Sequence, residues 1–298
     1  MFKNILVPLD GSNLSEAALA PAAYLAETLK SQVTLLHIIE KEAPTEIHKE
    51  RHLTQADDAN AYLKEVAKRA FPPQVKVETH VHTAAVSDVA RSIVDHAPEL
   101  RPDLIVICTH GRSGVHDLLY GNIAQQVIAM GTIPLLVIKT KIPSFKLKKM
   151  LIPLDPESMH DTTLGVAESL AKIFKAELHL LSIIPTLSTL GGEQAAVGNL
   201  LPGTTKAYLD LDVVNTKQDL QIHIDALNKG HVEAIAEVAR GDPASLIVKV
   251  AEQSGADMII LSTHRKAGMS AFWARSVAPK VAQKTKTPLL LIPLFQNE

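Results

Sequence analysis

The sequence predicts an α/β protein made of two doubly wound domains in tandem, each built on a five-stranded parallel sheet. The first observation is an internal repeat, because Lys3–Glu40 aligns without a gap on Lys148–Pro185. Asp103–Lys139 aligns in the same way on Asp257–Pro293. The second observation is that short apolar runs alternate with segments of helical periodicity in both halves. Strands that are apolar throughout and alternate with helices are typical of a parallel sheet covered on both faces.

The repeat divides the chain of 298 residues near residue 145, and two domains are the ordinary expectation for this length. We expect the first domain over residues 1–140 and the second over 148–295. The connector 140–149 is short, basic and contains a proline. It should hold the halves together as an internal pseudo-dimer, with their last strands as candidates for pairing. Association of two whole chains into a homodimer stays open.

In the first half, the predicted elements follow the order of a βα repeat. Residues 5–9 form a β-branched and aliphatic run that ends in a turn at Asp10-Gly11-Ser12. Ser12 is a predicted N-cap for a helix whose apolar face runs from Ala17 to Leu29. The further strands expected in this half are 33–39, 75–81, 104–108 and 134–138. The further helices are 56–71, 121–130 and 88–96, the last of which Pro98 would close.

The second half repeats this order, with strands expected at 150–154, 178–184, 232–238, 258–262 and 289–292. Its expected helices are 163–174, 206–229, 244–252 and 276–284. Residues 187–205 carry the extra length of this half, and their glycine, proline and threonine content predicts a loop. Such a segment would serve as a lid or a partner site, or it would be a neutral insertion.

Composition limits the classes of function. The chain is 46% hydrophobic and 21% charged, which is ordinary for a globular protein. A net charge of -2 provides no general attraction for nucleic acid or acidic membranes. The single cysteine, Cys108, excludes an internal disulfide and a cysteine-based zinc cluster. No apolar run reaches the roughly 20 residues that cross a bilayer, and the N-terminus lacks the form of a signal peptide. We therefore expect a cytoplasmic protein.

The loop after the fourth strand, Cys108–Gly114, is a candidate phosphate cradle. Ligands of open parallel sheets bind at the carboxyl ends of the strands. Gly111 and Gly121 would let the backbone approach a polyphosphate, and a helix opens at Gly121-Asn122, where free N–H groups favour an anion. Asn122 adds a side-chain donor, with Arg112 nearby. The alternative is a loop that only turns, with a solvated arginine.

Asp10, at the end of the first strand, has two interpretations. It would form an Asx turn or cap the following helix, as the adjacent Gly11-Ser12 suggests. Alternatively, its carboxylate would accept hydrogen bonds from ribose hydroxyls or from an adenine amino group. Asp155 occupies the same place in the second half and does not decide between them, because a capping role would be duplicated as well.

Three segments together resemble the universal stress protein family in its tandem form. They are VPLD at the end of the first strand, LLHII in the second, and DLIVICTHGRSGVHDLLYGNIAQQV followed by IPLLVIK. The resemblance covers almost the whole of both halves and implies the adenine-nucleotide alpha hydrolase-like fold. Nucleotide-binding members carry Gly-x2-Gly-x9-Gly-Ser/Thr after the fourth strand, and this chain has Cys108-x2-Gly111-x9-Gly121-Asn122. Two glycines match, whereas a small cysteine replaces the first glycine and a polar asparagine replaces the hydroxyl residue.

The resemblance implies a stress-associated regulatory protein that binds ATP or AMP, with or without Mg²⁺, in its N-terminal half. The ribose and adenine would lie at the ends of the first two strands, and the phosphates in the loop after the fourth. The ligand-binding residues implied in this way are Pro8, Leu9, Asp10, Ile38, Gly111, Arg112, Gly114, Gly121, Asn122 and Ile123.

Two other classes of function stay open from the residues. A scaffold that binds no nucleotide would use surfaces such as 187–205 to contact an unknown protein partner. An enzyme would hydrolyse ATP slowly. The sequence shows no nucleophile–base–orienter pattern, no P-loop lysine and no carboxylate cluster for Mg²⁺, which disfavours the enzyme and leaves no catalytic residue to name.

The second half differs at the phosphate positions. Arg265 and Arg275 stand where the first half has Gly111 and Gly121, and each adds bulk where a phosphate would need bare backbone. This pattern indicates a degenerate site in the second half. The alternative is that these arginines recognise a different anion or reach into the neighbouring half.

Two weaker candidates complete the list. His80 and His82 share one face of a predicted strand and could ligate a metal, but no third ligand follows at a convincing spacing, so solvated strand residues are the simpler interpretation. Cys108 would be a small residue at a strand end, and nothing in the sequence supports a redox role for it.

Overall fold

The computed structural model describes residues 1–43, 46–47, 50–109, 123–139, 145–155, 162–264 and 277–294. The chain folds into two compact units. Unit 1 takes the described residues of 1–146, 263–264 and 288–294, and unit 2 takes those of 147–262 and 277–287. The predicted fold class, two α/β domains in tandem, is confirmed.

The sheet of unit 1 has the strand order β12-β7-β6-β1-β2-β5. Within this sheet, strands β1, β2, β5, β6 and β7 are parallel to one another, whereas β12 is antiparallel to its neighbour β7. The strands are β1 (Asn4–Pro8), β2 (Gln32–Glu40), β5 (Val77–Val86), β6 (Leu104–Cys108), β7 (Leu135–Ile138) and β12 (Leu289–Leu294). The interior strands β1, β6 and β7 are almost wholly buried, as their continuous apolar sequences require.

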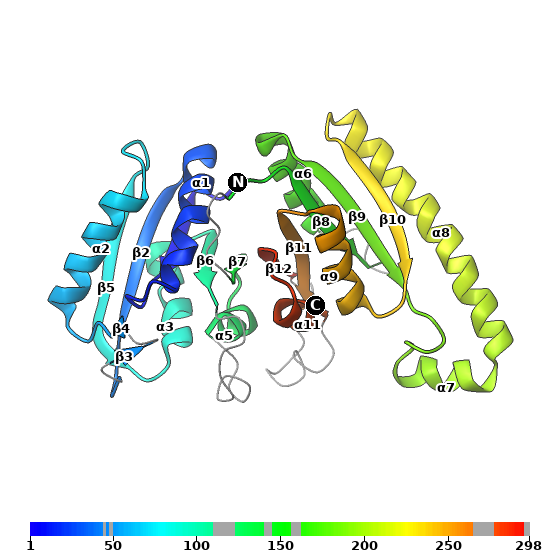
Figure 1. Cartoon of the computed structure of the whole chain (residues 1–298), viewed down its shortest axis with the longest axis horizontal. Helices are drawn as coiled ribbons and strands as arrows, with labels where there is room; N and C mark the ends of the chain where they lie inside the picture. Colours follow the sequence, from blue (N-terminus) through cyan, green and yellow to red (C-terminus); the bar gives the residue numbers. More distant parts are fainter. Residues whose placement is uncertain are drawn as a thin grey trace. The chain divides into compact units, whose positions relative to one another are not determined.

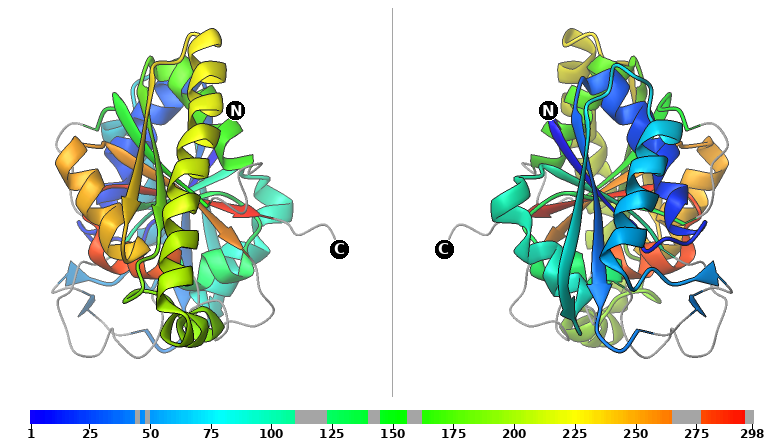
Figure 2. Two further views of the ribbon diagram at one scale, coloured as in Figure 1. Left: turned by 90° about the vertical axis from the view of Figure 1, so that its right-hand side faces the viewer. Right: turned by 90° about the vertical axis from the view of Figure 1, so that its left-hand side faces the viewer.

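Helices cover both faces of this sheet. Helix α2 packs on β5 and β2, and α3 and α4 lie on the opposite side (Figure 1, Figure 2). The helical segments are η1 (Ser15–Ala18), α1 (Leu19–Leu29), α2 (Ala56–Ala70), α3 (Val89–Asp95), α4 (Ala97–Leu100) and α5 (Ile123–Met130). A two-residue hairpin, β3 (Glu46–Ile47) with β4 (Glu50–Arg51), precedes α2.

Unit 2 repeats the parallel arrangement with the order β10-β9-β8-β11. Its strands are β8 (Lys149–Leu154), β9 (Glu177–Ile184), β10 (Ala234–Arg240) and β11 (Met258–His264). Its helices are α6 (Thr162–Phe174), α7 (Gly192–Leu200), α8 (Pro202–Lys229), α9 (Pro243–Ser254) and α11 (Val277–Lys284). The long helix α8 packs against β10 and β9, and α9 contacts α11.

Both units fasten the start of their first strand in the same way. Asp103 accepts hydrogen bonds from the backbone amides of Lys3 and Asn4, at 2.6 and 2.9 Å. In unit 2, Asp257 accepts two consecutive amides at the start of β8, at 2.8 and 2.9 Å. A carboxylate bound to two N–H groups satisfies donors that the parallel ladder leaves unpaired at this edge.

The helix predicted over 88–96 is confirmed as α3 (Val89–Asp95), which ends before Pro98. Pro98 itself lies in the first turn of the separate short helix α4, where its missing N–H costs nothing. Two local predictions were wrong. Residues 187–205 are largely helical, since they contain α7 and the start of α8; glycines and a proline inside these helices concealed the helical periodicity. Ser12 is not the cap of a long α-helix, because a 3₁₀ turn intervenes before α1.

The last strand of the second sequence half completes the sheet of unit 1. Residues Leu289, Leu290 and Leu291 of β12 face Val137, Leu136 and Leu135 of β7 in antiparallel register, and all six are buried. The predicted pairing of the two last strands is therefore confirmed. Without β12, β7 would present an unpaired apolar edge, which favours association between chains.

We therefore predict that a fragment of residues 1–142 self-associates at micromolar concentration, as sedimentation velocity would measure. A peptide of residues 286–294, added in trans, should suppress this association because it supplies the missing antiparallel strand. A fragment that stays monomeric without the peptide would contradict the role assigned to β12.

Candidate functional site

The end of β1 brings the first three predicted ligand residues to the carboxyl edge of the unit 1 sheet. The amide of Leu9 donates to the carbonyl of Leu36 at 2.8 Å, which continues the parallel ladder one residue beyond β1. Leu9 is buried at 4% exposure, whereas Pro8 and Asp10 are half-buried. The carboxylate of Asp10 is thus the first polar side chain where the strand leaves the core.

Asp10 forms a tight turn with the residues that follow it. Its Oδ1 atom accepts hydrogen bonds from the amide of Ser12 at 2.8 Å and from the Ser12 hydroxyl at 2.7 Å. The Ser12 hydroxyl in turn accepts from the amide of Ser15 at 3.2 Å and so opens the 3₁₀ turn. The Asx-turn interpretation of Asp10 is confirmed, and both of these bonds use the same carboxylate oxygen.

Gly11 allows this turn because its φ of +92° lies in a region that L side chains rarely adopt. A Cβ atom at this position would come within 2.7 Å of Leu53 Cδ1. The segment that leads into α2 therefore closes directly over the turn. In the second half a proline, Pro156, follows Asp155 at the equivalent place in the sequence.

His37 ties the turn to the segment above it. Its Nδ1 lies 2.8 Å from the carbonyl oxygen of Leu9, and its Nε2 lies 2.9 Å from that of Leu53, with the residue only 1% exposed. Both partners accept only, so a neutral imidazole, which has one N–H, could donate to just one of them. The equivalent residue of unit 2, Ser182, donates its hydroxyl to Leu154 O at 3.0 Å.

The role of His37 was not foreseen from the sequence. The signal was present, because His37 and Ser182 occupy matching positions in an otherwise similar strand. A residue that differs between two copies of one fold, at the edge where ligands bind, is a candidate for a function that only one copy keeps.

Ile38 and Ile123 are placed differently from one another. Ile38 is buried at 6% exposure, so its side chain offers little surface, but the β2–β5 ladder becomes irregular between Ile38 and Glu40. Such irregularities free backbone groups and are frequent beside functional sites. Ile123 opens α5 and is 39% exposed. The predicted residues Gly111, Arg112, Gly114, Gly121 and Asn122 lie outside the described part of the chain, as do Arg265 and Arg275.

The carboxylate of Asp10 acts electrostatically on its neighbours. Burial is the main cause that raises the pKa of the Cys108 thiol to about 11, and the negative charge of Asp10 raises this pKa further. Burial also raises the pKa of Tyr62, whose hydroxyl donates to Glu16 at 3.0 Å. Glu16 is in addition paired with Arg69 at 2.5 Å. Asp10 therefore lies among neutral groups and an already paired acid.

In unit 2, the equivalent edge is built less tightly. Asp155 is exposed and Ile183 is half-buried. The buried residue Ser182 replaces His37, so the carbonyl at the end of β8 has a short side-chain partner. Among the described residues, the two edges therefore share a backbone plan but differ in the side chains that surround it.

Comparison with known proteins agrees with the repeat. The family model described as "Universal stress protein family" matches residues 1–139 and again 146–293. A universal stress protein of Methanocaldococcus jannaschii is 30% identical over 148 residues, which cover 47% of this chain and 83% of the relative. A universal stress protein E homolog of Haemophilus influenzae is 25% identical and spans 97% of this chain and 96% of its own length.

A solved structure of a universal stress protein from Archaeoglobus fulgidus superposes with a TM-score of 0.73. It covers 99% of this chain and 97% of its own, at 16% identity, and so shows the fold alone. Two family matches that together span most of the sequence decide the class: the chain belongs to the universal stress protein family and carries two of its domains in tandem. None of the described helices has both the length and the apolar character needed to cross a membrane.

The glycine at the turn provides a first test. We predict that Gly11→Ala destabilises the protein by about 1 kcal/mol or more, because alanine is strained at this φ and its Cβ would meet Leu53. Gly165→Ala is the matched control, since nothing lies within 4 Å of that helical position; it should stabilise by about 0.5–1 kcal/mol. Denaturant titration measures both, and an unaffected Gly11→Ala variant would show that the turn is adaptable.

The thiol of Cys108 provides a second test. Its pKa, raised from 9.0 to about 11, keeps the thiol protonated at pH 8, so alkylation of the folded protein should be about 100-fold slower than that of the unfolded chain. The rate should rise until about pH 11. Between pH 9 and 11 the unfolded chain releases this proton first, so the thiol's contribution to stability is lost over that range.

Asp10→Asn is the matched variant for this titration. It removes the nearby negative charge and should lower the pH at which alkylation levels off, while the amide oxygen keeps the turn. Mass spectrometry after timed labelling gives the rates. A plateau at or below pH 9 in the unmodified protein would contradict the burial of Cys108, and an unchanged plateau in Asp10→Asn would contradict its placement beside Asp10.

Proposed function

We propose that this universal stress protein binds one adenine nucleotide per chain, ATP or AMP, at the carboxyl edge of the unit 1 sheet. The observation that carries the proposal is the set of differences between the two copies of the domain. Unit 1 keeps glycines at the two phosphate-approach positions of the sequence, whereas the second half has Arg265 and Arg275 there. The nucleotide would act as the signal in a stress-response function.

The described residues support a nucleoside end of the site at β1 and β2. The half-buried Asp10 carboxylate is the polar group available for ribose hydroxyls, and Leu53 covers the turn beside it. The irregular end of β2 at Ile38 would supply backbone groups for a base. Ile123 would pack at the start of α5, next to the loop expected to hold the phosphates.

Hydrolysis is not part of the proposal. Glu16, the acid that follows the turn, is occupied by Tyr62 and Arg69. Any Mg²⁺ would then be carried by the nucleotide's own phosphates. Binding without turnover suits a regulator whose state follows nucleotide concentration.

A second candidate is a protein-binding role that needs no nucleotide. It is favoured by the apolar side chains that α7 and α8 expose. Leu200 is 79% exposed, Ile222 66% and Tyr208 64%. Exposed apolar residues concentrated on two neighbouring helices are unusual for a monomer. Protein binding and nucleotide binding are compatible, but only the protein-binding role would persist if unit 1 bound no nucleotide.

Calorimetric titration with ATP should give a stoichiometry near one per chain. Gly121→Arg, which copies the second-half residue, should abolish binding and leave the melting temperature nearly unchanged. Gly203→Arg is the control, because it adds the same charge and bulk at a unit 2 position with nothing within 4 Å. Asp10→Asn should weaken binding by roughly tenfold or more, since a bond to a charged acceptor is lost.

Two equivalent sites, or no binding of ATP and AMP, would contradict the proposal. Unchanged affinity in Gly121→Arg would place the phosphates elsewhere. Equal losses in Gly121→Arg and Gly203→Arg would mean that added charge, and not the cradle, governs binding.

A further inference from the structure

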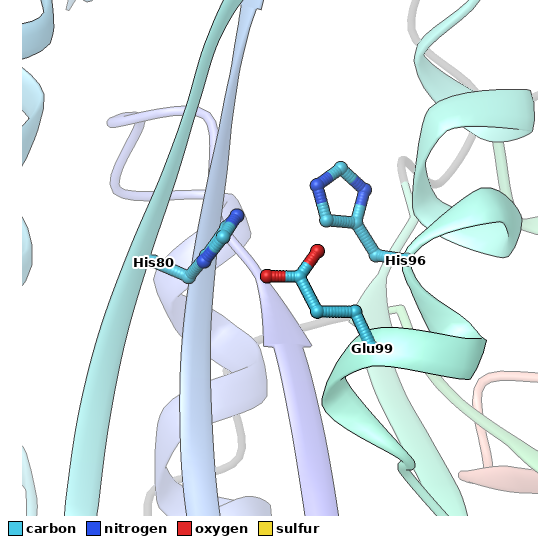
Figure 3. Close-up of side chains that lie close together, drawn as sticks. All are labelled: His80, His96 and Glu99. Atoms are coloured by element: carbon cyan, nitrogen blue, oxygen red, sulfur yellow. The ribbon is translucent and has the colours of Figure 1, made fainter.

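Three potential metal ligands converge beside the edge strand β5, on the face of the sheet opposite to helix α2. One ligand atom each from His80, His96 and Glu99 lie within 4.8 Å of one another. Figure 3 shows His80 extending from the strand toward His96 and Glu99, which belong to the helical segment α3–α4. Sequence spacing did not reveal this cluster, because α3 separates His80 from the other two along the chain.

His96 is already prepared to act as a ligand through one ring nitrogen. Its Nδ1 lies 2.6 Å from the backbone carbonyl oxygen of Ser92 and must therefore donate. In a neutral ring, the lone pair would then lie on Nε2. Metal-binding histidines commonly donate their second nitrogen to a carbonyl or carboxylate in this way, which fixes the ring and its tautomer. His96 is also buried at 7% exposure, so the ring is held in place.

His80 complements this arrangement. Its ring packs edge-on against that of His96, with centroids 5.1 Å apart. The two rings are therefore already neighbours at the place where their ligand atoms converge.

Glu99 supplies the negative charge of the cluster. Its side chain is exposed on α4 and reaches the two histidines. Two imidazoles and one carboxylate are a ligand set that zinc accepts while a further position stays open to water. Magnesium and calcium prefer oxygen ligands and do not suit two imidazoles.

Only small movements would close the site. Zinc ligands at 2.0–2.2 Å in tetrahedral geometry lie roughly 3.4 Å from each other. The ligand atoms here are at most 4.8 Å apart. His80 is half-buried and Glu99 is exposed, so both can adjust around the fixed His96 ring.

We propose that His80, His96 and Glu99 form a binding site for a divalent transition-metal ion of the zinc type. The site lies on the α3–α4 face of unit 1 and does not depend on the proposed nucleotide site. A bound ion would fasten α3–α4 to β5, the edge strand of the sheet. It would thereby stabilise β5, which pairs with another strand on one side only.

In the test, the metal-free full-length chain is titrated with Zn²⁺ and the heat of binding is measured by calorimetry. One Zn²⁺ per chain should bind, and Mg²⁺ should not compete. His80→Gln and His96→Asn should each weaken binding by at least about 100-fold, beyond the loss typical of outer-shell changes. Asparagine at 96 keeps an N–H donor for the Ser92 carbonyl while removing the ligand atom, so this variant tests the ligand and not the packing.

His82→Gln is the matched control. His82 shares the strand face with His80, and its ring also packs against His96 at 4.9 Å, but it is not among the three converging ligands. Its affinity for Zn²⁺ should change by no more than about threefold. His231→Gln, at an exposed position of unit 2, controls for weak surface binding.

A second readout protects the test from misfolding. Zn²⁺ should raise the melting temperature of the unmodified protein and of His82→Gln, but not of His80→Gln or His96→Asn, whose metal-free melting temperatures should stay near that of the unmodified chain. Absence of saturable Zn²⁺ binding would overturn the proposal. So would a loss confined to His82→Gln or to His231→Gln.

Discussion

Hydrogen bonding within buried parallel strands governs the rest of this structure. Strands β1 and β6 are almost wholly buried, so their buried amides must find protein partners. Parallel pairing meets that demand only if all carboxyl ends leave the sheet at one edge. The Asp103 carboxylate satisfies the amides at the opposite edge. Asp10 and Cys108 therefore lie close together as a consequence of the way in which the buried strands satisfy their backbone hydrogen bonds.

The two copies of the domain separate what the fold needs from what a function adds. The carboxylates Asp103 and Asp257 make the same bonds in both units, which marks them as structural. His37 and Ser182 both bond the carbonyl at the end of the first strand, and among the described residues the histidine alone also contacts a second segment, at Leu53. Divergence is thus concentrated at the edge where parallel sheets bind ligands, while the opposite edge is kept.

The sequence predicted the elements that depend on a local pattern of apolar residues. Apolar runs such as 104–108 became strands with the expected bounds, because continuous burial leaves little alternative. The segment 187–205 was misjudged because glycine and proline are weak guides when neighbouring helices decide. Of the His80–His96–Glu99 cluster, the sequence indicated only His80, as part of a strand pair with His82. The other two ligands belong to the helical segment α3–α4, which is distant from His80 along the chain (Figure 3). Contacts of this kind depend on packing and not on spacing.

The position of β12 has a consequence for synthesis. The strand that completes the sheet of unit 1 is translated after all of unit 2, about 150 residues behind β7. At about 5–20 residues per second, the ribosome needs roughly 8–30 s to cover that distance. During this interval the nascent N-terminal unit has a full core but an open apolar edge. A nonsense codon just before residue 289 would therefore leave the edge of β7 open in the unit that was made first.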